Sequence, residues 1–162
     1  MKLNIIRVIL ILLLLSTFFI IFNFSSQDAE KSGSVSGKVT ETVTSNIKFI
    51  QKLEKSEKEK VLDRTEKIIR KIAHFSIYTL VGLLLMGLAS TYNLDERKRI
   101  CISLIIGAIY ATTDEIHQSF IPGRSSQITD VMLDSLGVLC GILILMLILQ
   151  ITTRKGGKIK NE

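Results

Sequence analysis

An acidic cluster follows a short apolar run in this chain, and this feature most constrains what the chain can fold into. The run, residues 100–113, holds 14 residues, which cover about 21 Å as a helix, whereas the apolar core of a bilayer is about 30 Å thick. If this segment spans a membrane, Asp114, Glu115 and His117 lie at or just inside its boundary. An ionisable group costs about 2.5–3.5 kcal/mol at the bilayer centre and less near the interface. We therefore expect these side chains to be paired, solvated or used in a functional site.

Three longer apolar blocks accompany this run, at residues 8–22, 73–92 and 131–151. Hydrophobic residues make up 47% of the 162 residues and gather in these blocks, a pattern typical of membrane proteins. Only helices and closed barrels satisfy the backbone in lipid, and the sequence lacks the alternating segments of about ten residues that barrel strands need. The sequence therefore predicts an all-α, polytopic bundle with four transmembrane helices.

The predicted spans divide the chain into four parts. Residues 1–24 form a first transmembrane helix of the signal-anchor type, because no A-x-A cleavage site follows it. Residues 25–71 form an extracytoplasmic loop that starts with a flexible, Ser/Gly-rich connection at 25–38 and continues as amphipathic helices on a membrane or on the other helices. Residues 72–151 hold the other three transmembrane helices, and residues 152–162 form a basic cytoplasmic tail. The first amphipathic helix is defined by Val39, Val43, Ile47, Ile50 and Leu53. A second amphipathic piece, defined by Leu62, Thr65, Ile69 and Ile72, leads into the second span.

The basic residues alone do not decide the orientation, because nine lie on the side of the two termini and eleven lie in the first loop. The signal-like start and the compact Arg97-Lys98-Arg99 turn predict cytoplasmic termini in a bacterial plasma membrane. Attraction to anionic lipid head groups explains the net charge of +6, and no nucleic-acid motif is present. The expected partners are therefore membrane lipids and not nucleic acid.

This topology gathers polar residues at one end of the bundle, the outer end. His74 opens the second span, residues 114–118 close the third, and Asp130 and Asp134 open the fourth. Arg124 lies in the turn between the last two. Small residues within the spans would let these helix ends approach closely. They are Gly82, Gly87, Gly107, Gly137 and Gly141.

Helical spacing indicates which residues of this cluster share a helix face. Tyr110, Asp114 and His117 share one helix face, and so do His74 and Tyr78. The site candidates follow from this placement. Those for catalysis are His74, Asp114, Glu115 and His117, and those for substrate binding are Gln118, Arg124, Asp130, Asp134, Tyr78 and Tyr110.

Four interpretations of the cluster remain open. In a structural one, Arg124 pairs with Asp114 or Asp130 and the network locks the helix ends. In a catalytic one, a His–carboxylate pair performs acid–base chemistry on a lipid-linked or glycan substrate, with His117 or Glu115 preferred for proton transfer. In a binding one, Arg124 contacts an anionic head group without turnover. A divalent metal is less favoured, because the sequence holds no complete metal motif.

Four segments carry a family resemblance: Phe-Ser-Ser-Gln at 24–27, Lys-Ile-Ala-His-Phe-Ser-Ile-Tyr at 71–78, Asp-Glu-Ile-His-Gln-Ser-Phe-Ile-Pro-Gly-Arg at 114–124, and Asp-Val-Met-Leu-Asp-Ser-Leu-Gly at 130–137. With these segments the chain resembles VanZ-like membrane proteins, small four-helix proteins named for a glycopeptide (teicoplanin) resistance determinant. One departure is Asp134, where the family often has Asn. The resemblance implies a cell-envelope role and low-level glycopeptide resistance, but no particular activity or cofactor.

We therefore expect an envelope protein that recognises or modifies a cell-wall or lipid-linked component at an outward-facing polar site and influences teicoplanin susceptibility. A cell-wall precursor or the glycopeptide itself is the candidate ligand. The alternative is a non-catalytic binder, or a translocation helper, for an anionic lipid or drug. The nearly apolar cytoplasmic halves of the spans count against a path through the bundle.

Overall fold

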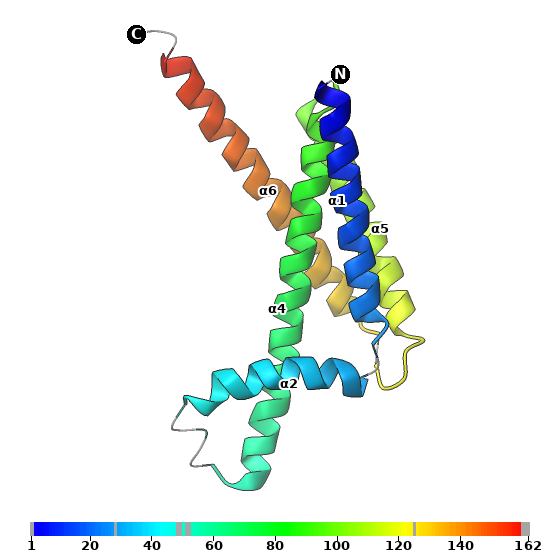
Figure 1. Ribbon diagram of the computed structural model, residues 1–162, viewed down its shortest axis with the longest axis vertical. Coiled ribbons are helices and arrows are strands. Elements are labelled where there is room, and N and C mark those ends of the chain that lie inside the picture. Colours follow the sequence, from blue (N-terminus) through cyan, green and yellow to red (C-terminus); the bar gives the residue numbers. More distant parts are fainter. Residues whose placement is uncertain (1, 28, 48–49, 51–52, 125, 160–162) are drawn as a thin grey trace.

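The computed structural model describes all residues except 1, 28, 48–49, 51–52, 125 and 160–162. Its helices are α1 (Lys2–Ser25), α2 (Ala29–Ser45), α4 (Lys55–Ser90), α5 (Glu96–Gln118) and α6 (Ile128–Ile159). The described residues contain no strand. α1, α4 and α5 follow the long axis of the molecule, α6 runs obliquely across α4, and both termini lie toward one end (Figure 1). α2 crosses α4 near the opposite end.

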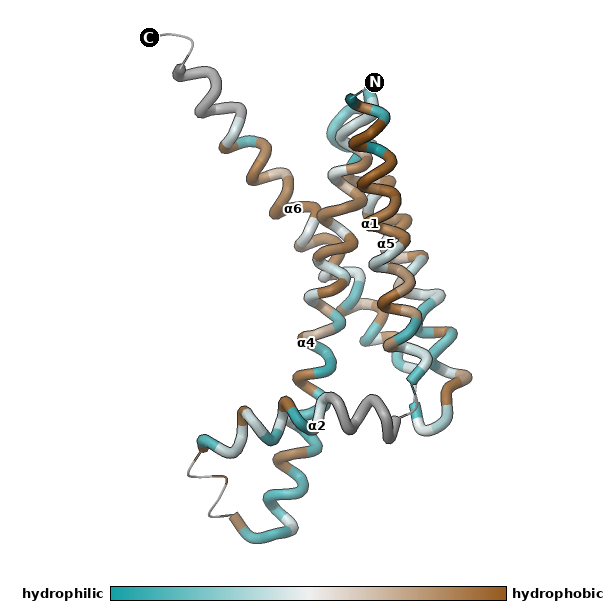
Figure 2. Tube along the Cα trace, viewed as in Figure 1, coloured by the Kyte–Doolittle hydropathy of each residue, from teal (hydrophilic) through white to brown (hydrophobic). Residues whose placement is uncertain are grey.

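Among the described residues, four helices are long and apolar enough to cross a membrane: α1, α4, α5 and α6. Large hydrophobic side chains such as Phe19 and Ile109 are exposed along them, and Figure 2 shows the apolar residues concentrated in these helices. Exposing such surface to water costs about 25 cal/mol per Å² of apolar area, so lipid is the solvent that suits it. The prediction of an all-α, multi-pass membrane protein with four spans is confirmed.

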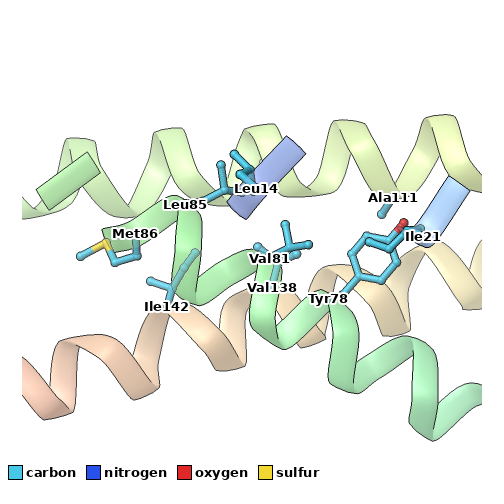
Figure 3. Packing of buried hydrophobic residues seen from close by; sticks show 9 residues of the cluster. All are labelled: Leu14, Ile21, Tyr78, Val81, Leu85, Met86, Ala111, Val138 and Ile142. Carbon is cyan, nitrogen blue, oxygen red and sulfur yellow. The ribbon is translucent and has the colours of Figure 1, made fainter. Parts of the chain in front are cut away.

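The core of the bundle forms where α6 crosses α4, and glycines make this crossing close. Gly82 of α4 lies against the backbone carbonyl of Val138, and Gly141 of α6 lies against that of Thr79. A Cβ at either position would overlap backbone atoms, so these contacts require glycine. Gly107 of α5 receives the side chain of Val138 in the same way, with its Cβ position 2.5 Å from Cγ1. The buried hydrophobic cluster around the crossing (Figure 3) consists of Leu14, Ile21, Tyr78, Val81, Leu85, Met86, Ala111, Val138 and Ile142.

α4 contains the predicted second span and the amphipathic piece that leads into it, and it begins before both. It begins at Lys55 and not near residue 72, and its 36 residues extend about 54 Å. Its first turns therefore project past the ends of α1 and α5 (Figure 1). Residues 55–71 are rich in Lys and Glu, which favour helix, and include no Gly or Pro to end it. The second amphipathic piece and the second span are thus one continuous helix.

The prediction of a flexible connection over residues 25–38 is wrong from Ala29 onward, because α2 begins there. Tertiary contact with α4 supports this helix, and Ser36 Oγ donates a hydrogen bond to Glu66 Oε1 at 2.9 Å. α2 ends at Ser45, so the predicted amphipathic helix does not continue from it through Ile47. Packing that the local sequence does not encode therefore moves both boundaries of this helix toward the N-terminus.

The buried face of α2 is polar. Thr40 and Thr44 are buried, and each hydroxyl donates to a backbone carbonyl one turn earlier in the helix, at 2.9 Å and 2.7 Å. Val39 and Val43 are 47% and 50% exposed. The other helices therefore cover this apolar stripe only in part, and the membrane stays the predicted surface for its exposed part.

Candidate functional site

Three titratable side chains from three different helices meet at the end of the bundle opposite the termini. They are His74 of α4, Asp114 of α5 and Asp134 of α6. Each offers one nitrogen or oxygen atom, and these atoms all lie within 4.8 Å of one another. The sequence predicted that these residues lie at the same end of the bundle, and the structure brings them into one group.

His74 and Asp134 form the side of this group between α4 and α6. His74 Nδ1 lies 3.6 Å from Asp134 Oδ2, which is an ion-pair distance and longer than a good hydrogen bond. Asp134 is only 2% exposed, and its Oδ1 has no hydrogen-bond partner among the described residues. The Asp134 carboxylate is thus buried with half of its accepting capacity unused.

Asp114 is held by a chain of hydrogen bonds that reaches Arg124. Asp114 Oδ2 accepts from the Tyr78 hydroxyl at 3.3 Å and from Gln118 Nε2 at 3.0 Å. Gln118 Oε1 in turn accepts from Arg124 Nη1 at 3.0 Å, and Arg124 Nη2 donates to the Phe24 carbonyl at 3.3 Å. The Arg124 guanidinium is therefore positioned by α1 and α5.

Two other candidates, Glu115 and Asp130, lie in different surroundings. Glu115 is buried, and its Oε1 accepts from the backbone N–H of Gln127 at 2.7 Å, so it fixes the turn before α6. Asp130 forms an ion pair with Lys71 of α4. Proline and glycine shape the turn itself, as the sequence predicted, with Gly123 at a φ of 76°.

His117 and Tyr110 face α1 and not the group of three. His117 Nε2 lies 3.0 Å from Ser26 Oγ, and its ring stacks on Phe22 with centroids 4.7 Å apart. The Tyr110 hydroxyl donates to the Phe18 carbonyl at 2.8 Å. α5 contacts α1 as well as α4 and α6. Residues that share a helix face with Asp114 can therefore have different neighbours.

A cavity of about 440 Å³ opens over His74 and Asp134. Three cations of α4 line this cavity, namely Lys67, Arg70 and Lys71. None of them was among the predicted site residues. Their spacing to His74 is i, i+3, i+4 and i+7, so one stripe of a continuous helix carries all four. Following this stripe from His74 toward the N-terminus of a continuous helix would have identified the three cations from the sequence. The other lining residues are Glu115, Gln118, Gly123, Arg124, Gln127 and Asp130.

A second cavity, of about 260 Å³, lies next to the first and is mostly apolar. Arg70, His74 and Arg124 line both cavities, so the polar and the apolar space meet at these side chains. Gln27 and Ser36 also reach the second cavity. Its apolar lining comes from α1, α2 and α4, and consists of Ile21, Phe24, Val39, Ile69, Ala73 and Ile77.

Four membrane-crossing helices with a polar cavity at one end define the class: a small multi-pass membrane protein with a candidate ligand site. The VanZ/LLP1 family model matches residues 9–149, which is nearly the whole chain. The chain therefore belongs to the VanZ/LLP1 family, and the resemblance seen in the sequence is confirmed. No curated protein and no solved structure gives a significant match.

Proposed function

We propose that this VanZ-family protein recognises or modifies an anionic, lipid-linked component of the bacterial cell envelope, and thereby influences glycopeptide (teicoplanin) susceptibility. The observation that carries the proposal is the meeting of a cation-lined cavity with an apolar cavity at Arg70, His74 and Arg124. A ligand with a charged head and a hydrocarbon chain matches both spaces at once. We place the cavities on the extracytoplasmic side, with both termini in the cytoplasm.

The arginines support an anionic head group. Arg70 Nε is buried without a hydrogen-bond partner among the described residues, while Arg70 Nη2 pairs with Glu66 at 2.9 Å. Arg124 has its guanidinium anchored by Gln118. Arg prefers phosphate and carboxylate groups, because its planar fork donates two parallel hydrogen bonds to them.

The apolar side supports a lipid. The second cavity is bordered by Val39 of α2, whose exposed apolar stripe suits the membrane surface. An acyl chain entering between α2 and α4 would bring its head group to Arg70. The combination favours a lipid-linked ligand over a soluble one, because a soluble anion would leave the apolar cavity unfilled.

His74 is the preferred acid–base residue if the ligand is modified. It lines both cavities, and Asp134 lies near its Nδ1, so the carboxylate can orient the ring and stabilise its protonated form. His117 is held against Phe22 and Ser26, outside the lining of either cavity. Catalysis therefore predicts a strong effect of His74→Gln on turnover with a small effect on binding, whereas a pure binder tolerates His74→Gln.

Lipid binding to the purified chain tests the proposal. We expect native mass spectrometry to show more retained phosphatidylglycerol than phosphatidylcholine. Arg124→Gln should weaken phosphatidylglycerol binding by about tenfold to a hundredfold, the effect of losing a charge-assisted hydrogen bond. Arg97→Gln, which removes the same charge from the exposed first turn of α5, is the matched control and should bind like wild type. Equal retention of both lipids, or equal loss in both variants, would contradict the proposal.

A further inference from the structure

The group His74, Asp114 and Asp134 has the composition of a metal site. We propose that these three residues bind one divalent transition-metal ion, Zn²⁺ or Mn²⁺, beside the 440 Å³ cavity that His74 and Asp134 line. One imidazole nitrogen and two carboxylate oxygens would be the protein ligands. The inclusion of a nitrogen favours these ions over Mg²⁺ and Ca²⁺, which prefer all-oxygen sites.

The distances fit one ion. Ligand atoms bound at about 2.0–2.2 Å from a metal lie about 3–4 Å from one another. The three ligand atoms lie within 4.8 Å of one another, so side-chain movements of less than about 1 Å would complete the site. The residues come from α4, α5 and α6, so their convergence depends on the tertiary fold and not on closeness in sequence.

A buried acceptor without a partner points to a missing cation. Asp134 is 2% exposed and lines the cavity, and its Oδ1 accepts no hydrogen bond from any described residue. Leaving such an acceptor unsatisfied in a membrane protein costs free energy. A divalent ion bound between Asp114 and Asp134 would neutralise these two buried carboxylates in their ionised form.

The ligands are oriented in advance, as in natural metal sites. The Tyr78 hydroxyl and Gln118 Nε2 both donate to Asp114 Oδ2, which fixes the rotation of that carboxylate. Three protein ligands leave further coordination positions open toward the cavity. With the ion bound, His74 would be a metal ligand in place of the acid–base role proposed for it above. Contact between the ion and an anionic head group would follow, and this last step rests on the proposed function, whereas metal binding itself does not.

Metal titration of the full chain tests the inference in the absence of added lipid. The chain is purified in detergent, its affinity tag is removed, and metals are stripped with EDTA. Isothermal titration calorimetry with Zn²⁺, and electron paramagnetic resonance with Mn²⁺, should show one ion bound per chain. Mg²⁺ should bind at least tenfold more weakly than Mn²⁺.

Variants locate the site. Asp134→Asn and His74→Gln should each weaken binding at least tenfold. Asp63→Asn removes an equal charge from an exposed carboxylate of α4 and should leave the affinity unchanged. The titration of the wild-type chain shows whether an ion binds at all, even if a variant fails to fold. Absence of stoichiometric Zn²⁺ and Mn²⁺ binding, or wild-type affinity in folded Asp134→Asn and His74→Gln, would overturn the inference. Metal binding without selective lipid retention would support this inference and refute the proposed function alone.

Discussion

Replacing Gly137 with alanine tests whether the close contact of α4 with α6 holds the site together. A Cβ on Gly137 would lie 2.7 Å from the Phe75 carbonyl oxygen and 3.1 Å from Tyr78 Cβ. Ordinary C···O contacts measure about 3.3–3.6 Å, so the helices would have to separate by about 0.6–0.9 Å. The contact lies within one helical turn of His74 on α4 and of Asp134 on α6, so this movement would also widen their 3.6 Å ion pair.

The expected magnitude combines two opposing terms. Overpacking of a close contact costs about 1–3 kcal/mol, while alanine is favoured over glycine in a helix by about 0.5–1 kcal/mol. Gly87→Ala is the matched control, because a Cβ there meets only Leu145 Cδ2 at 3.7 Å and Leu10 Cδ2 at 3.9 Å. Both variants share the gain in helix propensity. The difference between their free energies of unfolding therefore isolates the overpacking cost, about 1–3 kcal/mol.

Equilibrium unfolding in mixed detergent micelles, followed by circular dichroism, measures this difference. We expect Gly137→Ala to unfold at lower denaturing detergent than wild type, and Gly87→Ala to unfold at the same or a higher concentration. If Gly137→Ala were as stable as Gly87→Ala, the close α4–α6 contact would not be needed for the fold, and the reasoning would be wrong.

Two further predictions concern the other end of the bundle. Asp95 caps α5 by accepting from the Lys98 backbone N–H at 2.9 Å, and this hydrogen bond lowers the pKa of the Asp95 carboxyl. A pKa lowered in the folded state stabilises the fold above the ordinary Asp value and loses that effect as the pH falls. Asp95→Ala should therefore lower the thermal midpoint at pH 7, with a gap to wild type that shrinks below about pH 4, and a gap independent of pH would contradict this. Arg7 donates to the Thr91 carbonyl at 2.6 Å and lies 4.1 Å above the Tyr92 ring. Because lysine cannot reproduce this fork, Arg7→Lys should reduce the free energy of unfolding by about 1 kcal/mol in the same detergent titration, and an unchanged value would refute it.

The four spans and the turn at Gly123 could be predicted from the sequence, because apolar length and Pro-Gly turns are local signals. The bounds of α2 and the early start of α4 could not be predicted from the sequence. The residues of α2 look flexible in isolation, and its helix depends on packing against α4 through side chains such as Ser36. The sequence of α2 also gives no indication that its polar face, with Thr40 and Thr44, is buried while the apolar Val39 stays half exposed.

The sequence predicted that the site residues lie at one end of the bundle, but not which of them come into contact. Helical periodicity placed His117 with Asp114, but α5 contacts α1 as well as α4 and α6, and the His117 ring stacks on Phe22 of α1. The cations of α4 were missed because the site was sought at the ends of the predicted spans, and these cations lie before the predicted second span. Once residues 55–90 are one helix, Lys67, Arg70 and Lys71 fall on the face of His74.

Teicoplanin susceptibility, measured in cells with membrane protein levels quantified, tests most directly whether the cavity is a working site. Wild type, His74→Gln, Arg124→Gln and the control Arg97→Gln would be expressed in the same susceptible strain. We predict protection by wild type and Arg97→Gln, and loss of protection in His74→Gln or Arg124→Gln at wild-type protein level. Equal protection by all four proteins would contradict the account and leave the polar cluster as a structural link between helix ends.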